Sequence, residues 1–272
     1  MTEFKRRLRD GDPVAGHWLS VGDPTVAEVC ARDADFAVVD TEHAPNDVET
    51  VANVARAVES AGGKEAAGSG DSADDESTAL LARVAWNDPV RIKRVLDTGV
   101  SGVLVPMVET AEEAREAVEA VRYPPEGVRG IAGSRANDYG RELAEQVERG
   151  GADLVTVLQV ETERAVENAG DIAAVEGVDA LLVGPADLSA SLGVFGEYES
   201  DTFREAVADV LATTRDADAH EADTPVGTLA TNDDEIRLWA EYGYDYQIVG
   251  VDAGYLAAGA ERARGAYEDA MR

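Results

Sequence analysis

Cysteine and long apolar runs are scarce in this sequence. Cys30 is the only cysteine among 272 residues, so no disulfide can form within the chain and an intracellular setting is favoured. No run approaches the roughly 20 apolar residues of a membrane-spanning helix, and the charged segment 1–10 lacks the apolar stretch of a signal peptide. We therefore expect a cytoplasmic protein with no membrane partner.

Positive charge is also scarce. Lys and Arg number 24 against 55 Asp and Glu, which gives a formal net charge of −31. This charge argues against nucleic acid and anionic membranes as partners. The acidic residues are spread along the whole chain, a composition typical of a halophilic protein whose self-repulsion is screened by dense counterions. The alternative, a single acidic tail that binds a partner, has no counterpart in the sequence.

The few lysines and histidines limit the chemistry. None of the three lysines, Lys5, Lys64 and Lys93, follows a predicted strand, so we expect neither Schiff-base chemistry nor pyridoxal phosphate. Three histidines and one cysteine, dispersed through the chain, disfavour a zinc site built from these residue types. His220 lies in an acidic stretch, 215–224, and is expected outside the functional site.

Short apolar, β-branched runs alternate with longer stretches of helical periodicity. This pattern predicts repeated strand–helix units around a parallel sheet. Eight strand candidates favour one (β/α)₈ barrel domain, a TIM barrel of the α/β class over residues 1–272, and a doubly wound open sheet is the alternative. An acidic surface insertion is expected at about 62–77. The strand candidates are 14–19, 36–40, 80–84, 102–105, 154–159, 180–183, 226–229 and 246–249.

Helix starts are predicted from capping residues. Asp23 and Asp88 each stand before a proline, which suits the first helical position. Further helices are expected to open at 46–47, 110–111, 201–202 and 232–233.

Several strand candidates end in polar residues. The carboxyl ends of the strands form the active face of a (β/α)₈ barrel. His43 follows the second strand, Arg83 belongs to the third, and Glu161 and Asp187 follow the fifth and sixth. We expect these four residues at one rim, where a buried arginine or carboxylate is costly unless it is paired or bound to metal.

Glu161 and Asp187 offer hard carboxylate oxygens from adjacent strands. Such ligands suit Mg²⁺ or Mn²⁺, with Co²⁺ as a further alternative, while water and substrate fill the other positions. The structural alternatives are that Glu161 caps a following helix and that Asp187 caps the turn at 188–189. At the same rim, the His43 imidazole can take or relay a proton near neutral pH.

Several motifs follow one another along the chain: DTEHAPND (40–47), WNDPVRIKRVLDTGVSGVLVPMV (86–108), RYPPEGVRG (122–130), QVET (159–162) and GPADLS (184–189). Their order and spacing, from about Gly16 to Arg264, resemble the HpcH/HpaI aldolase family. The resemblance implies a divalent-metal-dependent class II aldolase on a (β/α)₈ barrel, usually a homo-hexamer in which the last helix is exchanged between neighbours. Its substrate would be a 2-keto-3-deoxy (4-hydroxy-2-oxo) acid, cleaved to pyruvate and an aldehyde.

The resemblance also assigns roles to matching positions. It implies metal ligation by Glu161 and Asp187, a base at His43, transition-state stabilisation by Arg83, and keto-acid contacts from Gln159 and from the backbone of Ala186.

The same resemblance gives His43 a carboxylate partner at Asp97. Asp97 ends a predicted helix and should lie at the opposite end of its own barrel, so it could reach His43 only in another subunit. Asp40, three residues before His43, is the partner available within the chain, or else a cap at the strand end.

Two other functions stay open at this point. A related metal-enolate lyase acting on a CoA thioester or on phosphoenolpyruvate would use similar carboxylates, although no Lys/Arg cluster suggests a nucleotide site. A barrel that binds a keto acid or a metal without turnover, or a purely structural subunit, is the second alternative.

Overall fold

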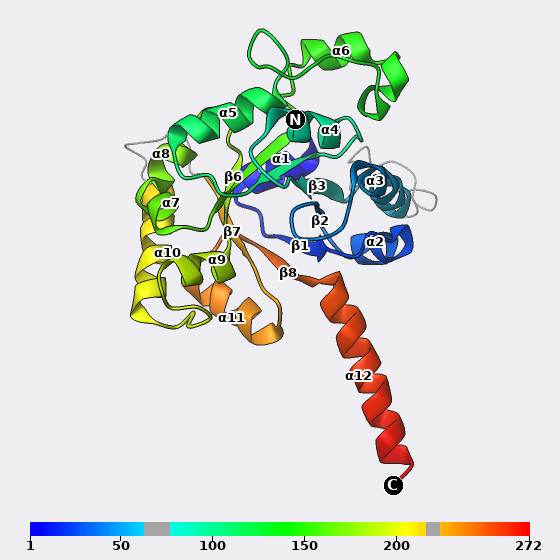
Figure 1. Ribbon diagram of the computed structural model, residues 1–272, viewed down its shortest axis with the longest axis vertical. Helices are drawn as coiled ribbons and strands as arrows, with labels where there is room; N and C mark the ends of the chain where they lie inside the picture. Colours follow the sequence, from blue (N-terminus) through cyan, green and yellow to red (C-terminus); the bar gives the residue numbers. More distant parts are fainter. Residues whose placement is uncertain (63–76, 216–223) are drawn as a thin grey trace.

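Eight parallel strands close into a barrel in sequence order, β1 to β8, in this computed structural model (Figure 1). The structure describes residues 1–62, 77–215 and 224–272, so the insertion expected near 62–77 and the segment that holds His220 lie largely outside the described residues. The barrel confirms the (β/α)₈ prediction and excludes the open sheet. The strands are β1 (Val14–Leu19), β2 (Phe36–Asp40), β3 (Ala79–Arg83), β4 (Gly102–Val105), β5 (Val155–Val160), β6 (Ala180–Val183), β7 (Val226–Leu229) and β8 (Tyr246–Val251).

Helices follow the strands, and the six predicted helix starts agree with α2, α3, α4, α5, α10 and α11 to within one or two residues. The Asp23 carboxylate accepts the N–H groups of Thr25 and Val26, and Asp88 accepts that of Arg91. The helices are α1 (Glu3–Asp10), α2 (Pro24–Ala31), α3 (Val48–Gly62), α4 (Pro89–Leu96), α5 (Ala111–Val121), α6 (Leu143–Glu148), α7 (Glu163–Glu167), α8 (Ala169–Ala173), α9 (Pro185–Ser191), α10 (Asp201–Thr214), α11 (Asp233–Tyr242) and α12 (Asp252–Ala270), with a 3₁₀ segment at Arg135–Gly140.

Two apolar cores hold the barrel together. Side chains pointing inward, such as Phe36, Leu104 and Leu182, fill its interior, and Phe4 and Leu8 of α1 join this inner core. The outer core packs the other face of the strands against the surrounding helices. Successive strand residues therefore point alternately into the inner and the outer core. Polar residues lie at the carboxyl ends of the strands, which form the active face of such a barrel.

Lys5 of α1 anchors that helix to the amino-terminal end of the barrel. Its Nζ lies 3.0 Å from Oδ2 of Asp179, whose side chain is fully buried, and donates to the carbonyl oxygens of Ala152 at 2.9 Å and Leu154 at 2.6 Å. All three ammonium N–H groups thus have an acceptor. The lysine has a structural role there.

We expect Lys5→Met to lower the free energy of unfolding by about 3 kcal/mol, because it leaves the buried Asp179 carboxylate without its main counter-charge. Denaturant unfolding measures the change. Lys93→Met, on α4, is the matched control and should stay within about 0.5 kcal/mol of the parent protein. Equal losses in the two variants would contradict this role for Lys5.

The last helix, α12, extends away from the barrel (Figure 1). Its side chains are almost all exposed, among them the apolar Tyr255, Leu256 and Tyr267 at 42%, 54% and 62%. Its first residue, Asp252, is fully buried and accepts hydrogen bonds from the N–H groups of Ser20 and Val21. The start of α12 is therefore anchored in the barrel, whereas the rest of the helix extends away from it. This arrangement suits a helix that is exchanged between subunits. The exchange itself stays a prediction.

Within the described part of the chain, none of the helices has both the length and the apolar character needed to cross a membrane.

Candidate active site

A buried ion pair joins β2 and β3 at their carboxyl ends. Asp40 stands opposite Arg83 in the strand register, and Nε and Nη2 of Arg83 each donate to one Asp40 carboxylate oxygen at 2.8 Å. Burial raises the pKa of Asp40, but hydrogen bonds and charge from Arg83 outweigh it, so the pKa lies below its ordinary value. Asp40 is thus an anion that orients the guanidinium.

Two further residues fix the Arg83 guanidinium. Its Nη1 lies 2.8 Å from Oε2 of Glu42, and its Cζ lies 4.5 Å from the centre of the Trp18 ring. The arginine is therefore held by carboxylates on two edges and by an aromatic ring on one face. Sequence reasoning missed both Trp18 and Glu42, although each stands at or next to the carboxyl end of its strand.

Glu161 follows β5 and points into the same end of the barrel. Its Oε1 accepts the N–H of Met107 at 2.7 Å, and its Oε2 accepts the amide of Gln159 at 2.9 Å. The alternative that Glu161 caps the next helix is wrong, because the Thr162 hydroxyl accepts the N–H of Ala165 and caps α7. The Glu161 carboxylate is therefore not used to cap α7 and is available to a ligand in the candidate site.

Met107 reaches Glu161 through an unusual backbone conformation. Its φ of 55° is left-handed, which is uncommon for a residue other than glycine and is often found at functional sites. The residue that donates its N–H to Glu161 thus has a strained backbone. The sequence places Met107 just after β4, at the carboxyl-end rim, but gives no signal for its contact with Glu161.

Burial of Glu161 changes its acidity. The residue is 4% exposed, and burial raises its pKa to about 7, while the Met107 N–H opposes the shift and the negative charges of Asp187 and Glu42 add to it. Three carboxylates thus act on one another around a buried position. A bound cation would relieve that repulsion.

Two further features concern the surroundings of the Glu161 carboxylate. A Cβ added to Gly184 would lie 2.9 Å from Oε2 of Glu161, so the glycine keeps that side open. The Gln159 Oε1 is buried and has no hydrogen-bond partner among the described residues.

Asp187 lies in the first turn of α9, after β6, and is exposed. Nowhere in the described ranges do three or more Asp, Glu, His or Cys side chains come together closely enough to enclose an ion. Asp187 is close enough to Glu161 for the two carboxylates to interact electrostatically.

In the metal-free protein, we expect Glu161 to make stability depend on pH. Its folded pKa of about 7 lies above the ordinary value of 4.5, so its contribution is fully present below pH 4.5 and is lost as pH rises through 7. Between these values the loss should be on the order of 3 kcal/mol. Urea unfolding with chelator at pH 5 and pH 8 measures it.

The matched control is Glu161→Gln, which removes the titrating group and should lose less stability between pH 5 and pH 8 than the parent protein does. An identical pH dependence in the two proteins would contradict the shift.

His43 lies on the loop after β2 and is exposed. Its backbone N–H donates to Oδ1 of Asp40 at 3.4 Å, as does that of Glu42 at 3.0 Å. Within the described residues, no hydrogen bond joins the Asp40 carboxylate to the His43 imidazole. Asp40 therefore caps the strand end and pairs with Arg83 in this chain.

The Glu42 carboxyl lies close enough to His43 for their charges to interact. Burial raises the pKa of Glu42, and the charges of Arg83 and His43 oppose that rise.

Ala186 lies in the first turn of α9, beside Asp187, and is exposed.

Asp97 ends α4, and its Oδ1 lies 3.2 Å from Nη2 of Arg129. Because α4 runs back from the carboxyl end of β3 to the start of β4, Asp97 lies at the end of the barrel opposite His43. The structure therefore brings together Asp40, Arg83, Gln159 and Glu161 but not Asp97. A role for Asp97 at the His43 of a neighbouring subunit stays a prediction.

These observations define a (β/α)₈ barrel whose carboxyl-end rim carries an oriented arginine beside buried carboxylates, an arrangement suited to stabilising a developing oxyanion. Residues 15–258 match the model of the HpcH/HpaI aldolase/citrate lyase family. The chain belongs to that family and is a carbon–carbon lyase.

Similar proteins support the assignment over nearly the whole chain. The chain is 36% identical to a 4-hydroxy-2-oxovalerate aldolase from Novosphingobium aromaticivorans, covering 96% of this chain and 92% of that one. It is 36% identical to a hydroxypyruvate/pyruvate aldolase from Delftia acidovorans, covering 97% and 91%. A solved HpcH/HpaI aldolase/citrate lyase family protein from Burkholderia cenocepacia J2315 shares 34% identity and superposes with a TM-score of 0.87, covering 98% and 100%.

Proposed function

We propose that this protein is a divalent-metal-dependent aldolase that reversibly cleaves a 4-hydroxy-2-oxo acid to pyruvate and an aldehyde. Of two relatives at 36% identity, one is named a 4-hydroxy-2-oxovalerate aldolase and the other a hydroxypyruvate/pyruvate aldolase. The observation that carries the proposal is the juxtaposition of the fixed Arg83 with the buried Glu161 at one end of the barrel. A positive charge and a cation-binding carboxylate there suit an enolate.

Glu161 and Asp187 would hold the metal, Mg²⁺ or Mn²⁺ with Co²⁺ as an alternative. When bound, the ion supplies positive charge to the carboxylate and 2-keto oxygen of the substrate. Gln159 lies beside Glu161 and would contact the keto acid together with the Ala186 backbone.

The bond between C3 and C4 breaks in the cleavage direction. Its electron pair moves toward the 2-keto oxygen, where the Arg83 guanidinium stabilises the enolate charge. His43 removes the proton of the C4 hydroxyl, so that C4 leaves as the aldehyde carbonyl. Protonation of the enolate at C3 then gives the methyl group of pyruvate, and the reverse sequence gives condensation.

Pyruvate release from a panel of 4-hydroxy-2-oxo acids tests the proposal. We expect release with metal present and its loss after chelation. Full activity in protein shown to be free of metal would reject the metal-dependent scheme.

His43→Ala should lower kcat about 100-fold, because it removes the base that moves the C4 hydroxyl proton. Because the side chain is exposed, folding should be unchanged. Steady-state rates and circular dichroism give the two readouts, and Glu116→Ala, at an exposed position of α5, is the control. An unchanged kcat in His43→Ala would remove His43 as the base.

The assembly and setting are part of the same proposal. The protruding α12 supports a homo-oligomer, which we propose to be a hexamer with exchanged last helices. The net charge of −31 and the single Cys30 support a halophilic, cytoplasmic enzyme. Light scattering across a KCl series tests the assembly and its salt tolerance. We expect a hexamer that is stable in concentrated salt. A stable monomer at every salt concentration would contradict both the hexamer and the halophilic character.

A further inference from the structure

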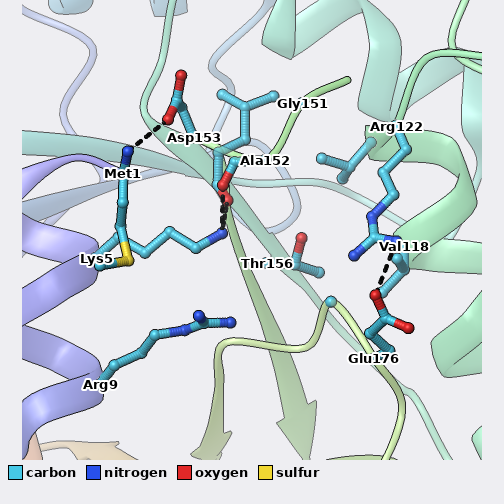
Figure 2. A pocket seen from close by; sticks show the side chains of 13 residues that line it. Met1, Lys5, Arg9, Val118, Arg122, Gly151, Ala152, Asp153, Thr156 and Glu176 are labelled. Carbon is cyan, nitrogen blue, oxygen red and sulfur yellow. Dashed lines mark hydrogen bonds and ion pairs between the residues drawn. The ribbon is translucent and has the colours of Figure 1, made fainter. Parts of the chain in front are cut away.

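A cavity of about 300 Å³ lies at the amino-terminal end of the barrel, far from the rim described above. It is bounded by α1, by the end of α5, by the start of β5 and by the turn before β6. Figure 2 shows Arg9, Arg122 and Thr156 around it. Basic side chains thus gather at one hollow in a protein with only 24 basic residues.

Neither guanidinium group makes a hydrogen bond within the described part of the chain. Nη2 of Arg9 lies 3.3 Å from Oδ1 of Asp179 as an ion pair. Nη1 of Arg122 lies 3.9 Å from Glu176, whose side chain is 94% exposed. Both guanidinium groups therefore keep donors available to a ligand.

Thr156 adds a buried polar group to the cavity. The residue is 2% exposed, and its side chain lies beside the hollow in Figure 2. Its hydroxyl has no hydrogen-bond partner among the described residues, whereas its backbone N–H donates to Asp179. Because Thr156 lines the cavity, its hydroxyl can donate to a group that is bound there.

The turn before β6 makes room for Arg122. Gly177 has a φ of +103°, and a Cβ at this position would lie 2.6 Å from Nη2 of Arg122. A side chain there would displace the guanidinium from the cavity.

The charged groups that face the cavity near α1 have a net positive charge. Lys5 and Arg9 share the single buried carboxylate of Asp179. Asp153 is paired with Arg149 at 3.2 Å and with the Met1 amine at 2.8 Å. The exposed Glu176 can turn into solvent.

We propose that this cavity binds a small oxyanion, a carboxylate or phosphate group, between the Arg9 and Arg122 guanidinium groups with the Thr156 hydroxyl as a further donor. Guanidinium forks match both anions in geometry. The proposal does not depend on the aldolase reaction. Binding would tie α1 to the starts of β5 and β6, whose far ends lead to Glu161 and Asp187.

Thermal unfolding with inorganic phosphate or succinate, at constant ionic strength, tests the site. We expect a saturable rise in Tm in the parent protein and in Arg115→Gln, an exposed control on α5. Arg9→Gln and Arg122→Gln should bind the anion at least tenfold more weakly. The tighter of the two anions identifies the recognised group as phosphate or carboxylate.

A Glu161→Gln protein separates this cavity from the catalytic end and should respond like the parent protein. The proposal is overturned by the absence of a saturable rise, by equal affinity in all variants, or by a response that is lost in Glu161→Gln but kept in the two arginine variants.

Discussion

Glu161→Gln should lower the rate of pyruvate release by 1,000-fold or more. Glu161 is the buried carboxylate of the proposed metal site, and its charge, rather than its shape, would hold the cation. Glutamine keeps the volume and removes the charge. Metal content after gel filtration and kcat at saturating substrate measure the effect together.

The matched control is Glu163→Gln, two residues away on α7, where the side chain is exposed. It should retain both metal and activity. If Glu161→Gln kept its metal and its turnover, the metal would have to be held elsewhere, and the assignment of Glu161 would fail.

Arg83→Lys should lower kcat about 100- to 1,000-fold, the usual cost of removing one preorganised donor to a developing oxyanion. A lysine keeps the positive charge but cannot make the two parallel hydrogen bonds that Arg83 makes with Asp40. The charge would then lose its fixed position. We expect kcat to fall more than KM rises, because the interaction grows in the transition state.

Arg56→Lys, an exposed arginine on α3, should leave kcat unchanged. The opposite pattern for Arg83→Lys, a higher KM with the parent kcat, would make Arg83 a substrate-binding residue only.

Most of the barrel could be predicted from local sequence patterns. The limits of β1, β2, β4, β6 and β7 agree with the predicted runs, because each is a short apolar segment bounded by turn or cap residues. The strand β8 extends two residues further than predicted, to Val251. Its end is fixed by the buried Asp252, which bonds to the loop after β1. That contact exists only once the barrel has closed, so no local pattern contains it.

The site was predicted less completely because its contacts cross between strands. The spacing of three residues suggests that Asp40 partners His43, whereas the register of β2 and β3 sets the Asp40 carboxylate against Arg83. The sequence shows that a buried arginine needs a partner but does not identify it. Trp18 was missed for the same reason, since its contact with Arg83 depends on the curvature of the barrel.

Exchange of the pyruvate methyl protons in D₂O tests the central claim most directly, because it detects the enolate without any assumption about the aldehyde. We expect exchange, followed by proton NMR, that requires a divalent metal, stops with chelator and is strongly reduced in Arg83→Lys. A metal-loaded, folded protein that catalyses no exchange would contradict the account and leave a keto-acid binder or a lyase with a different substrate.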